Sequence, residues 1–67
     1  MNSIQRGILQ TAADPAHQYV TVALDHKATM VAVAGLVYRG LLTLRDSDGK
    51  RANYFITAKG VRALRDE

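Results

Sequence analysis

The sequence predicts a small α+β fold, mostly α-helical, with three helices and a β-hairpin in its C-terminal half. Two segments within the first forty residues repeat apolar side chains at helical spacing. Further on, Leu42 and Leu44 alternate with Thr43 and Arg45, as in a strand with one buried face. Tyr54 and Ile56 alternate in the same way with Asn53 and Phe55. Between them, Asp48-Gly49 supplies the positive backbone dihedrals that a tight turn needs.

Ser3 is predicted to be the N-cap of the first helix, because a serine hydroxyl can cap a helix N-terminus. Asp14-Pro15 is predicted to end it, since proline cannot continue the hydrogen-bond ladder. Four apolar residues between these points share helical spacing and are expected on its buried face: Ile4, Ile8, Leu9 and Ala12.

Residues 19–22, Tyr-Val-Thr-Val, are short and β-branched, and they predict a short third strand. In the alternative interpretation, Thr21 caps a one-turn helix that runs from Val22 to His26. The central helix is predicted over His26–Tyr38, because its length and its Ala, Met and Leu content favour a helix over a strand. Gly40 is expected to stop this helix by taking a positive φ.

In the hairpin, one set of alternating side chains is predicted to face the core, and Phe55 is predicted to point the other way. An aromatic side chain there is either covered by a helix or left as an interface anchor. Thr57 is expected to cap the third helix, which holds Val61 and Leu64. The hairpin side chains expected in the core are Leu42, Leu44, Tyr54 and Ile56.

Composition excludes several classes of protein. Sixty-seven residues allow one domain, so residues 1–67 are treated as a single unit. No cysteine is present, which excludes disulfides and thiolate metal sites. The chain lacks an apolar run of about 18 residues and the apolar core of a signal peptide, so we expect a cytoplasmic protein without a membrane partner. His17 and His26 lack a third ligand at metal spacing, and we predict no catalytic, cofactor or metal site.

Positive charge is concentrated in the second half of the chain. Residues 1–38 carry two basic and two acidic side chains, whereas residues 39–67 carry seven basic and four acidic ones, which accounts for the whole net charge of +3. A basic half suggests a polyanionic partner, although a solubilising surface explains a charge of this size equally well.

Two stretches of the chain resemble the winged helix-turn-helix superfamily, most closely the MarR-type and PadR-type bacterial regulators. Leu36-Val37-Tyr38-Arg39-Gly40-Leu41-Leu42 is similar to the end of that family's recognition helix, and Tyr54-Phe55-Ile56-Thr57-Ala58-Lys59-Gly60 to the step that closes its wing. The likeness covers roughly residues 20–64. The chain departs from the family where only residues 22–26 stand in place of its second helix and turn, so the resemblance implies an abbreviated helix-turn-helix.

This resemblance implies a small protein that binds double-stranded DNA, a transcriptional regulator of bacterial or phage type. The central helix, about 26–38, would enter the major groove, and the wing, about 45–52, would contact the backbone. For Lys27 and Thr29 the alternative to DNA contact is an ordinary structural role, as a lysine in solvent and a threonine at the start of a helix. The side chains expected to contact DNA are His26, Lys27, Thr29, Met30, Arg45, Lys50 and Arg51.

The central helix also supports a different function. A helix that reads bases needs Arg, Lys, Asn or Gln at its exposed N-terminal positions. This helix has His26, Lys27 and Thr29 at its start and mostly apolar side chains after them. The alternative is a protein-interaction module on the same fold, which would form a homodimer or dock on another protein without binding DNA. A third reading is a fold whose DNA contacts have been lost. The expected protein-interface residues are Val31, Ala34, Tyr38 and Phe55.

Overall fold

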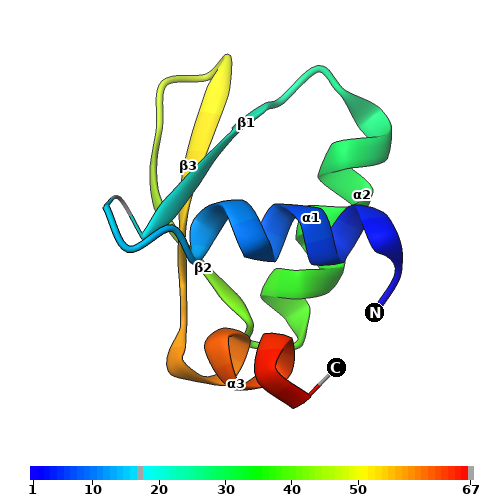
Figure 1. The fold of residues 1–67 in the computed structure, drawn as a ribbon. Helices are drawn as coiled ribbons and strands as arrows, with labels where there is room; N and C mark the ends of the chain where they lie inside the picture. The colour runs from blue at the N-terminus through cyan, green and yellow to red at the C-terminus, as the bar shows by residue number, and fades with distance from the viewer. Residues whose placement is uncertain (17, 67) are drawn as a thin grey trace.

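The computed structural model describes residues 1–16 and 18–66 as an α+β fold (Figure 1). His17, considered above as a metal ligand, lies outside the described residues. Helices account for about half of the chain, so the α+β class is confirmed, with a larger sheet than a mostly α-helical fold would have. The elements are α1 (Ser3–Ala12), β1 (Tyr19–Ala23), α2 (Lys27–Tyr38), β2 (Leu42–Ser47), β3 (Arg51–Ile56) and α3 (Ala58–Asp66).

The three strands form an antiparallel sheet in the order β1-β3-β2. The predicted third strand is therefore confirmed, and the alternative one-turn helix from Val22 to His26 is wrong. Val20 and Val22 are buried while Thr21 between them is exposed, so alternation of these β-branched side chains matches the pleat of a strand. β1 pairs with β3 along its whole length, from Tyr19 opposite Phe55 to Ala23 opposite Arg51.

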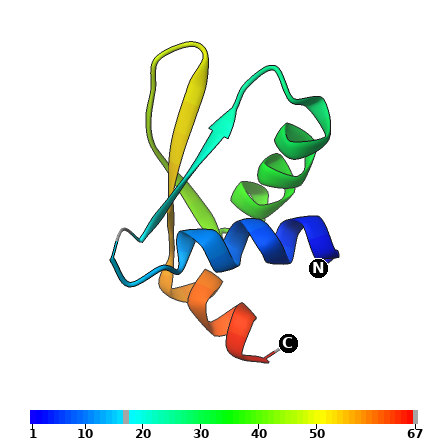
Figure 2. The same cartoon turned by 45° about the horizontal axis from the view of Figure 1, so that its top comes forward.

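Helices α1 and α2 pack on one face of the sheet, and α3 lies at the end where β2 begins and β3 ends (Figures 1 and 2). None of the helices in the described part of the chain covers the opposite face. The core is small because its members are small. The largest fully buried side chains are Leu9, Val33, Leu36 and Leu42.

The cap of α1 differs from the prediction by one residue, because Asn2 rather than Ser3 precedes the first turn. The Asn2 side chain accepts the backbone N–H of Gln5 at 2.8 Å, and Gln5 Oε1 accepts the N–H of Asn2 at 3.3 Å. Asparagine caps as well as serine does, and glutamine three residues on completes the reciprocal pair. Gln5 Nε2 also donates to the carbonyl of Ala32 at 3.4 Å, which ties α1 to α2.

The start of α3 is fixed by contacts to the end of α2. Thr57 caps α3 as predicted, accepting the Gly60 N–H at 3.0 Å, and its hydroxyl donates to the Gly40 carbonyl at 2.7 Å. The Thr57 N–H donates to the Leu41 carbonyl at 3.1 Å. Gly40 has a φ of 78°, which confirms the predicted helix stop. The two stretches that carry the family resemblance therefore meet directly in space.

Two predicted core residues are exposed. Ile4 is 53% exposed and Leu44 is 55% exposed, so the sequence prediction was wrong for both. Ile4 lies in the first turn of α1, beyond the buried pair Leu9 and Ala12. Leu44 lies on the edge strand β2, immediately before a bulge. Of the two leucines of β2 that were predicted to be in the core, Leu42 is buried and Leu44 is not.

Candidate nucleic-acid interface

The hairpin tip, residues 48–51, lies beside the end of β1 and the loop that leads to α2. The Leu24 N–H donates to the Lys50 carbonyl at 2.9 Å. The hydrogen bonding between β1 and β3 therefore continues one residue beyond the strands, into the loop before α2. Both segments reach the same edge of the molecule, at the top of Figure 1. Residues 23–25 and 49–51 line a groove of about 560 Å³ there. We call the exposed cations Lys27, Lys50 and Arg51 the basic edge.

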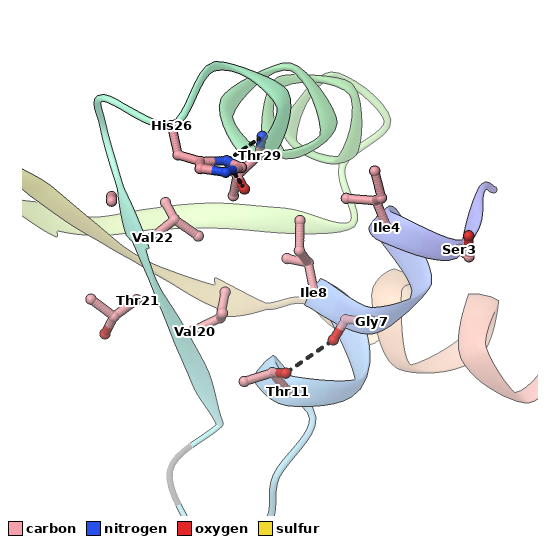
Figure 3. Close-up of a pocket in the computed structure, with 11 residues that line it drawn as sticks. Ser3, Ile4, Gly7, Ile8, Thr11, Val20, Thr21, Val22, His26 and Thr29 are labelled. Carbon is pink, nitrogen blue, oxygen red and sulfur yellow. Dashed lines mark hydrogen bonds between the residues drawn. The ribbon is translucent and has the colours of Figure 1, made fainter.

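His26 and Thr29, both predicted to contact DNA, are engaged with each other at the start of α2. The Nδ1 atom of His26 accepts the Thr29 N–H at 3.3 Å and lies 2.6 Å from the Thr29 hydroxyl (Figure 3). This is the geometry of an N-cap, so both side chains stabilise the first turn. Met30 is half-buried and packs against the core. Of the four residues predicted to contact DNA at the start of α2, Lys27 is therefore the one that is both exposed and positively charged.

The acidic residue at the hairpin tip, Asp48, stabilises the turn through hydrogen bonds to backbone amides. Asp48 Oδ1 accepts the backbone N–H groups of Arg51 at 2.8 Å and Lys50 at 2.9 Å. These hydrogen bonds, that from Arg51 first, hold the pKa of Asp48 below its ordinary value. Gly49 has a φ of 88°, in agreement with the predicted Asp-Gly turn. The Asp48 carboxylate is thus turned toward backbone amides.

Arg45 lies on β2, as its place in the predicted strand beside the wing loop implies, and on the face of the sheet that no described helix covers. The β2–β3 register shifts between Leu44 and Asp46, so Arg45 is the extra residue of a bulge. Its guanidinium carbon is 5.3 Å from the centroid of the Tyr19 ring and 5.4 Å from that of Phe55. Phe55 is 39% exposed and meets neither expectation fully, because an arginine rather than a helix lies over it.

A polar ladder crosses all three strands beside this cluster, and sequence reasoning missed it. The Thr21 hydroxyl donates to Asn53 Oδ1, and Asn53 Nδ2 donates to Asp46 Oδ1 at 2.6 Å. Asp46 Oδ2 is also 3.8 Å from Arg45 Nε. Only the strand order places these three residues side by side, so spacing along the chain carries no signal for them.

The outer face of α2 is exposed, as the interaction alternative expects. Val31 is 65% exposed and Tyr38 is 93% exposed, and Ala34 between them is also exposed. A shallow groove of about 510 Å³ borders this helix, between α1, β1 and the first turn of α2 (Figure 3). Ile8, Val20 and other apolar side chains line it, together with hydroxyls and His26, but no Lys, Arg, Asp or Glu of the described residues does so.

A second group of cations lies on α3, where the sequence analysis proposed no site. Lys59, Arg62 and Arg65 are all exposed. Their spacing of three residues along a helix is the signal that could have shown them as one stripe.

No protein-family model matches this chain, and no curated protein or solved structure is significantly similar to it. Among residues 1–16 and 18–66, no helix has the length and apolar character needed to cross a bilayer. Within the same residues, no three His, Asp or Glu side chains are grouped closely enough to hold a metal ion.

Proposed function

We propose that this protein binds double-stranded DNA through the sugar–phosphate backbone, with the basic edge as its contact surface and transcription regulation as its role. One observation carries the proposal. The hydrogen bond from Leu24 to the Lys50 carbonyl holds the hairpin tip, which carries Lys50 and Arg51, against the loop that leads to Lys27 at the start of α2. Exposed cations on a hairpin tip and at the start of a helix are suited to contact phosphates of a duplex.

Base reading contributes little in this proposal. His26 and Thr29 are committed to capping α2, Met30 packs on the core, and the exposed positions that follow are apolar. Discrimination between base pairs needs hydrogen-bonding side chains in the major groove. We therefore expect modest sequence preference and an affinity that comes mostly from counterion release.

The acids at this edge limit where a phosphate can lie. Asp48 faces the amides of its own turn, whereas Asp25 is exposed and lines the groove. A phosphate is expected on the exposed ammonium groups of Lys27 and Lys50, because the groove beside Asp25 repels it.

The test measures binding to a short duplex by fluorescence anisotropy at several salt concentrations. Wild-type affinity should fall steeply with salt. The double variant Lys27→Glu, Lys50→Glu should bind more weakly and reduce the logarithmic salt slope by about 1.8, because each lost phosphate contact removes about 0.9.

The double variant Lys59→Glu, Arg62→Glu is the matched control, since it makes the same change in net charge on α3. It should keep more affinity than the edge variant. Equal losses in the two variants, or a loss only in the control, would place the contact elsewhere and overturn the proposed edge.

A second candidate function rests on the exposed apolar face of α2, and its occupant is a second copy of the chain. Val31, Val37 and Tyr38 are exposed by 65%, 39% and 93%. Residues 1–38 have no net charge, so two such faces meet without the repulsion that the basic C-terminal half would produce. Sedimentation equilibrium should show a dimer that Val31→Glu dissociates. A monomer at every concentration would exclude this candidate.

A further inference from the structure

The open face of the sheet has its own chemistry, separate from the basic edge. Val20 and Val22 point toward α1 and α2, and Thr21 points to the other side of β1 (Figure 3). The same alternation places Asn53 and Phe55 with Thr21, since each pairs across β1 and β3. We call this surface the open face; it comprises Tyr19, Thr21, Thr43, Arg45, Asp46, Arg51, Asn53 and Phe55.

An aromatic pair with an arginine over it forms one end of the open face. Tyr19 and Phe55 are directly opposite each other on β1 and β3, so their Cβ atoms are about 5 Å apart. The guanidinium of Arg45 lies 5.3 Å and 5.4 Å from the two ring centroids. The side chain of Arg45 is 45% exposed and Phe55 is 39% exposed, so both planar groups reach solvent. Rings and a guanidinium of this kind are surfaces on which nucleobases stack.

The charge along the open face complements a nucleic-acid strand. Arg51 lies four residues from Phe55 on β3, a distance of about 13 Å at the usual rise of a strand. Arg45 and Arg51 therefore place positive charge at both ends of the face. Asp46 also lies on this face, 3.8 Å from Arg45, so Arg45, Arg51 and Asp46 together leave the open face with a net charge of +1.

We infer that the open face binds a short stretch of single-stranded nucleic acid, with bases on Tyr19, Phe55 and the planar group of Arg45 and a phosphate on Arg51. The shape of the face favours a single strand over a duplex. The major groove, about 12 Å wide, admits a helix or a two-stranded ribbon. Three strands about 4.8 Å apart, with their side chains, are wider than that groove. Unpaired bases can instead lie flat on the rings.

This inference stands independently of the proposed duplex function. The duplex proposal depends on Lys27 and Lys50, which are outside the open face, and Arg51 is the residue that the two surfaces share. Changes at Phe55 and changes at Lys50 therefore separate the two activities.

The natural chain contains no tryptophan, so Phe55→Trp introduces a unique fluorophore on the open face. Titration with a thymidine oligonucleotide should quench its emission, because the indole stacks on bases. Val61→Trp on α3 is the matched control, since Val61 is 41% exposed and Phe55 is 39% exposed. Its emission should change little. No response at Phe55→Trp, or an equal response at both sites, would overturn the inference.

Affinity measurements complete the test. Phe55→Ala should weaken binding to the oligonucleotide by roughly 5- to 150-fold, the range for one lost base stack. Arg45→Lys keeps the charge and removes the planar group, so it should weaken binding even where Phe55→Ala unfolds the chain. Unchanged affinity in Arg45→Lys and in a folded Phe55→Ala contradicts the inference. The inference is also contradicted if the emission of Phe55→Trp changes with protein concentration and not with oligonucleotide, because the open face would then be a contact between copies of the chain.

Discussion

Gly60 is the residue at which a single added carbon should matter most. A Cβ there would clash with the Leu41 carbonyl oxygen, and a backbone group cannot rotate away as a side chain can. We expect Gly60→Ala to lower the free energy of unfolding by about 1–3 kcal/mol, despite the better helix propensity of alanine. Urea denaturation measures this change.

Gly7→Ala is the control for Gly60, because both glycines lie inside helices and a Cβ on Gly7 meets nothing within 4 Å. It should raise the free energy of unfolding by up to about 1 kcal/mol. If both variants shift stability in the same direction, the contact between α3 and Leu41 is not the cause.

The Asp48 carboxylate should make stability depend on pH in acid. Its pKa is lowered in the folded chain by hydrogen bonds from the amides of Arg51 and Lys50. A lowered folded pKa stabilises the fold above the ordinary value of 3.8, and this contribution is lost as pH falls through the folded value. Asp48→Asn should therefore melt below the wild type at pH 7, and the two melting temperatures should converge below pH 3.8. A constant difference across this range would contradict the assignment.

Local chemistry explains which residues could be predicted. The roles of Gly40, Gly49 and Thr57 follow from backbone preferences within a few residues, and the structure confirms each of them. The close approach of Gly60 to Leu41 depends on how α3 docks, so no local pattern could reveal it. The bulge at Arg45 was not predicted, because a bulge has no periodic signal.

At the scale of elements, Thr57 links the end of one helix to the start of another. Its hydroxyl accepts from Gly60 in α3 and donates to the Gly40 carbonyl after α2. Thr57→Ala removes both hydrogen bonds and should cost about 1–2 kcal/mol of unfolding free energy. Thr57→Ser keeps the hydroxyl and should retain most of the stability. Equal losses in the two variants, measured by thermal denaturation, would show that the methyl group matters and the hydroxyl does not.

The order of elements was predictable because each has its own periodicity. Helical spacing, strand alternation and the Asp-Gly turn identified the three helices and the hairpin. The open face was not predictable, since it depends on β1 pairing with β3 rather than β2. That pairing brings Tyr19 against Phe55 across 36 positions of sequence, and it divides the predicted DNA contacts between the basic edge and the open face.

At the scale of the whole molecule, the small core limits what the fold tolerates. Among residues 1–16 and 18–66, ten apolar residues are buried, and many of them are Ala or Val. At about 0.05–0.15 kcal/mol per residue, a chain of 67 residues has a total stability of roughly 3–10 kcal/mol. One large cavity in the core can remove much of this stability. Substitutions should therefore be tolerated at exposed positions and not at the buried leucines.

Leu36→Ala tests this limit directly. Leu36 is fully buried in α2, at the centre of the core with Leu9 and Leu42, and truncation of such a leucine costs about 2–5 kcal/mol. We expect the variant to be largely unfolded at 37 °C by circular dichroism, or to melt at a much lower temperature. Ile4→Ala removes a side chain that is already 53% exposed, and it should cost less than about 1 kcal/mol. If Leu36→Ala melts within a few degrees of Ile4→Ala, the core does not depend on this leucine as its burial implies, and stability must come from elsewhere, such as a contact with a second copy of the chain.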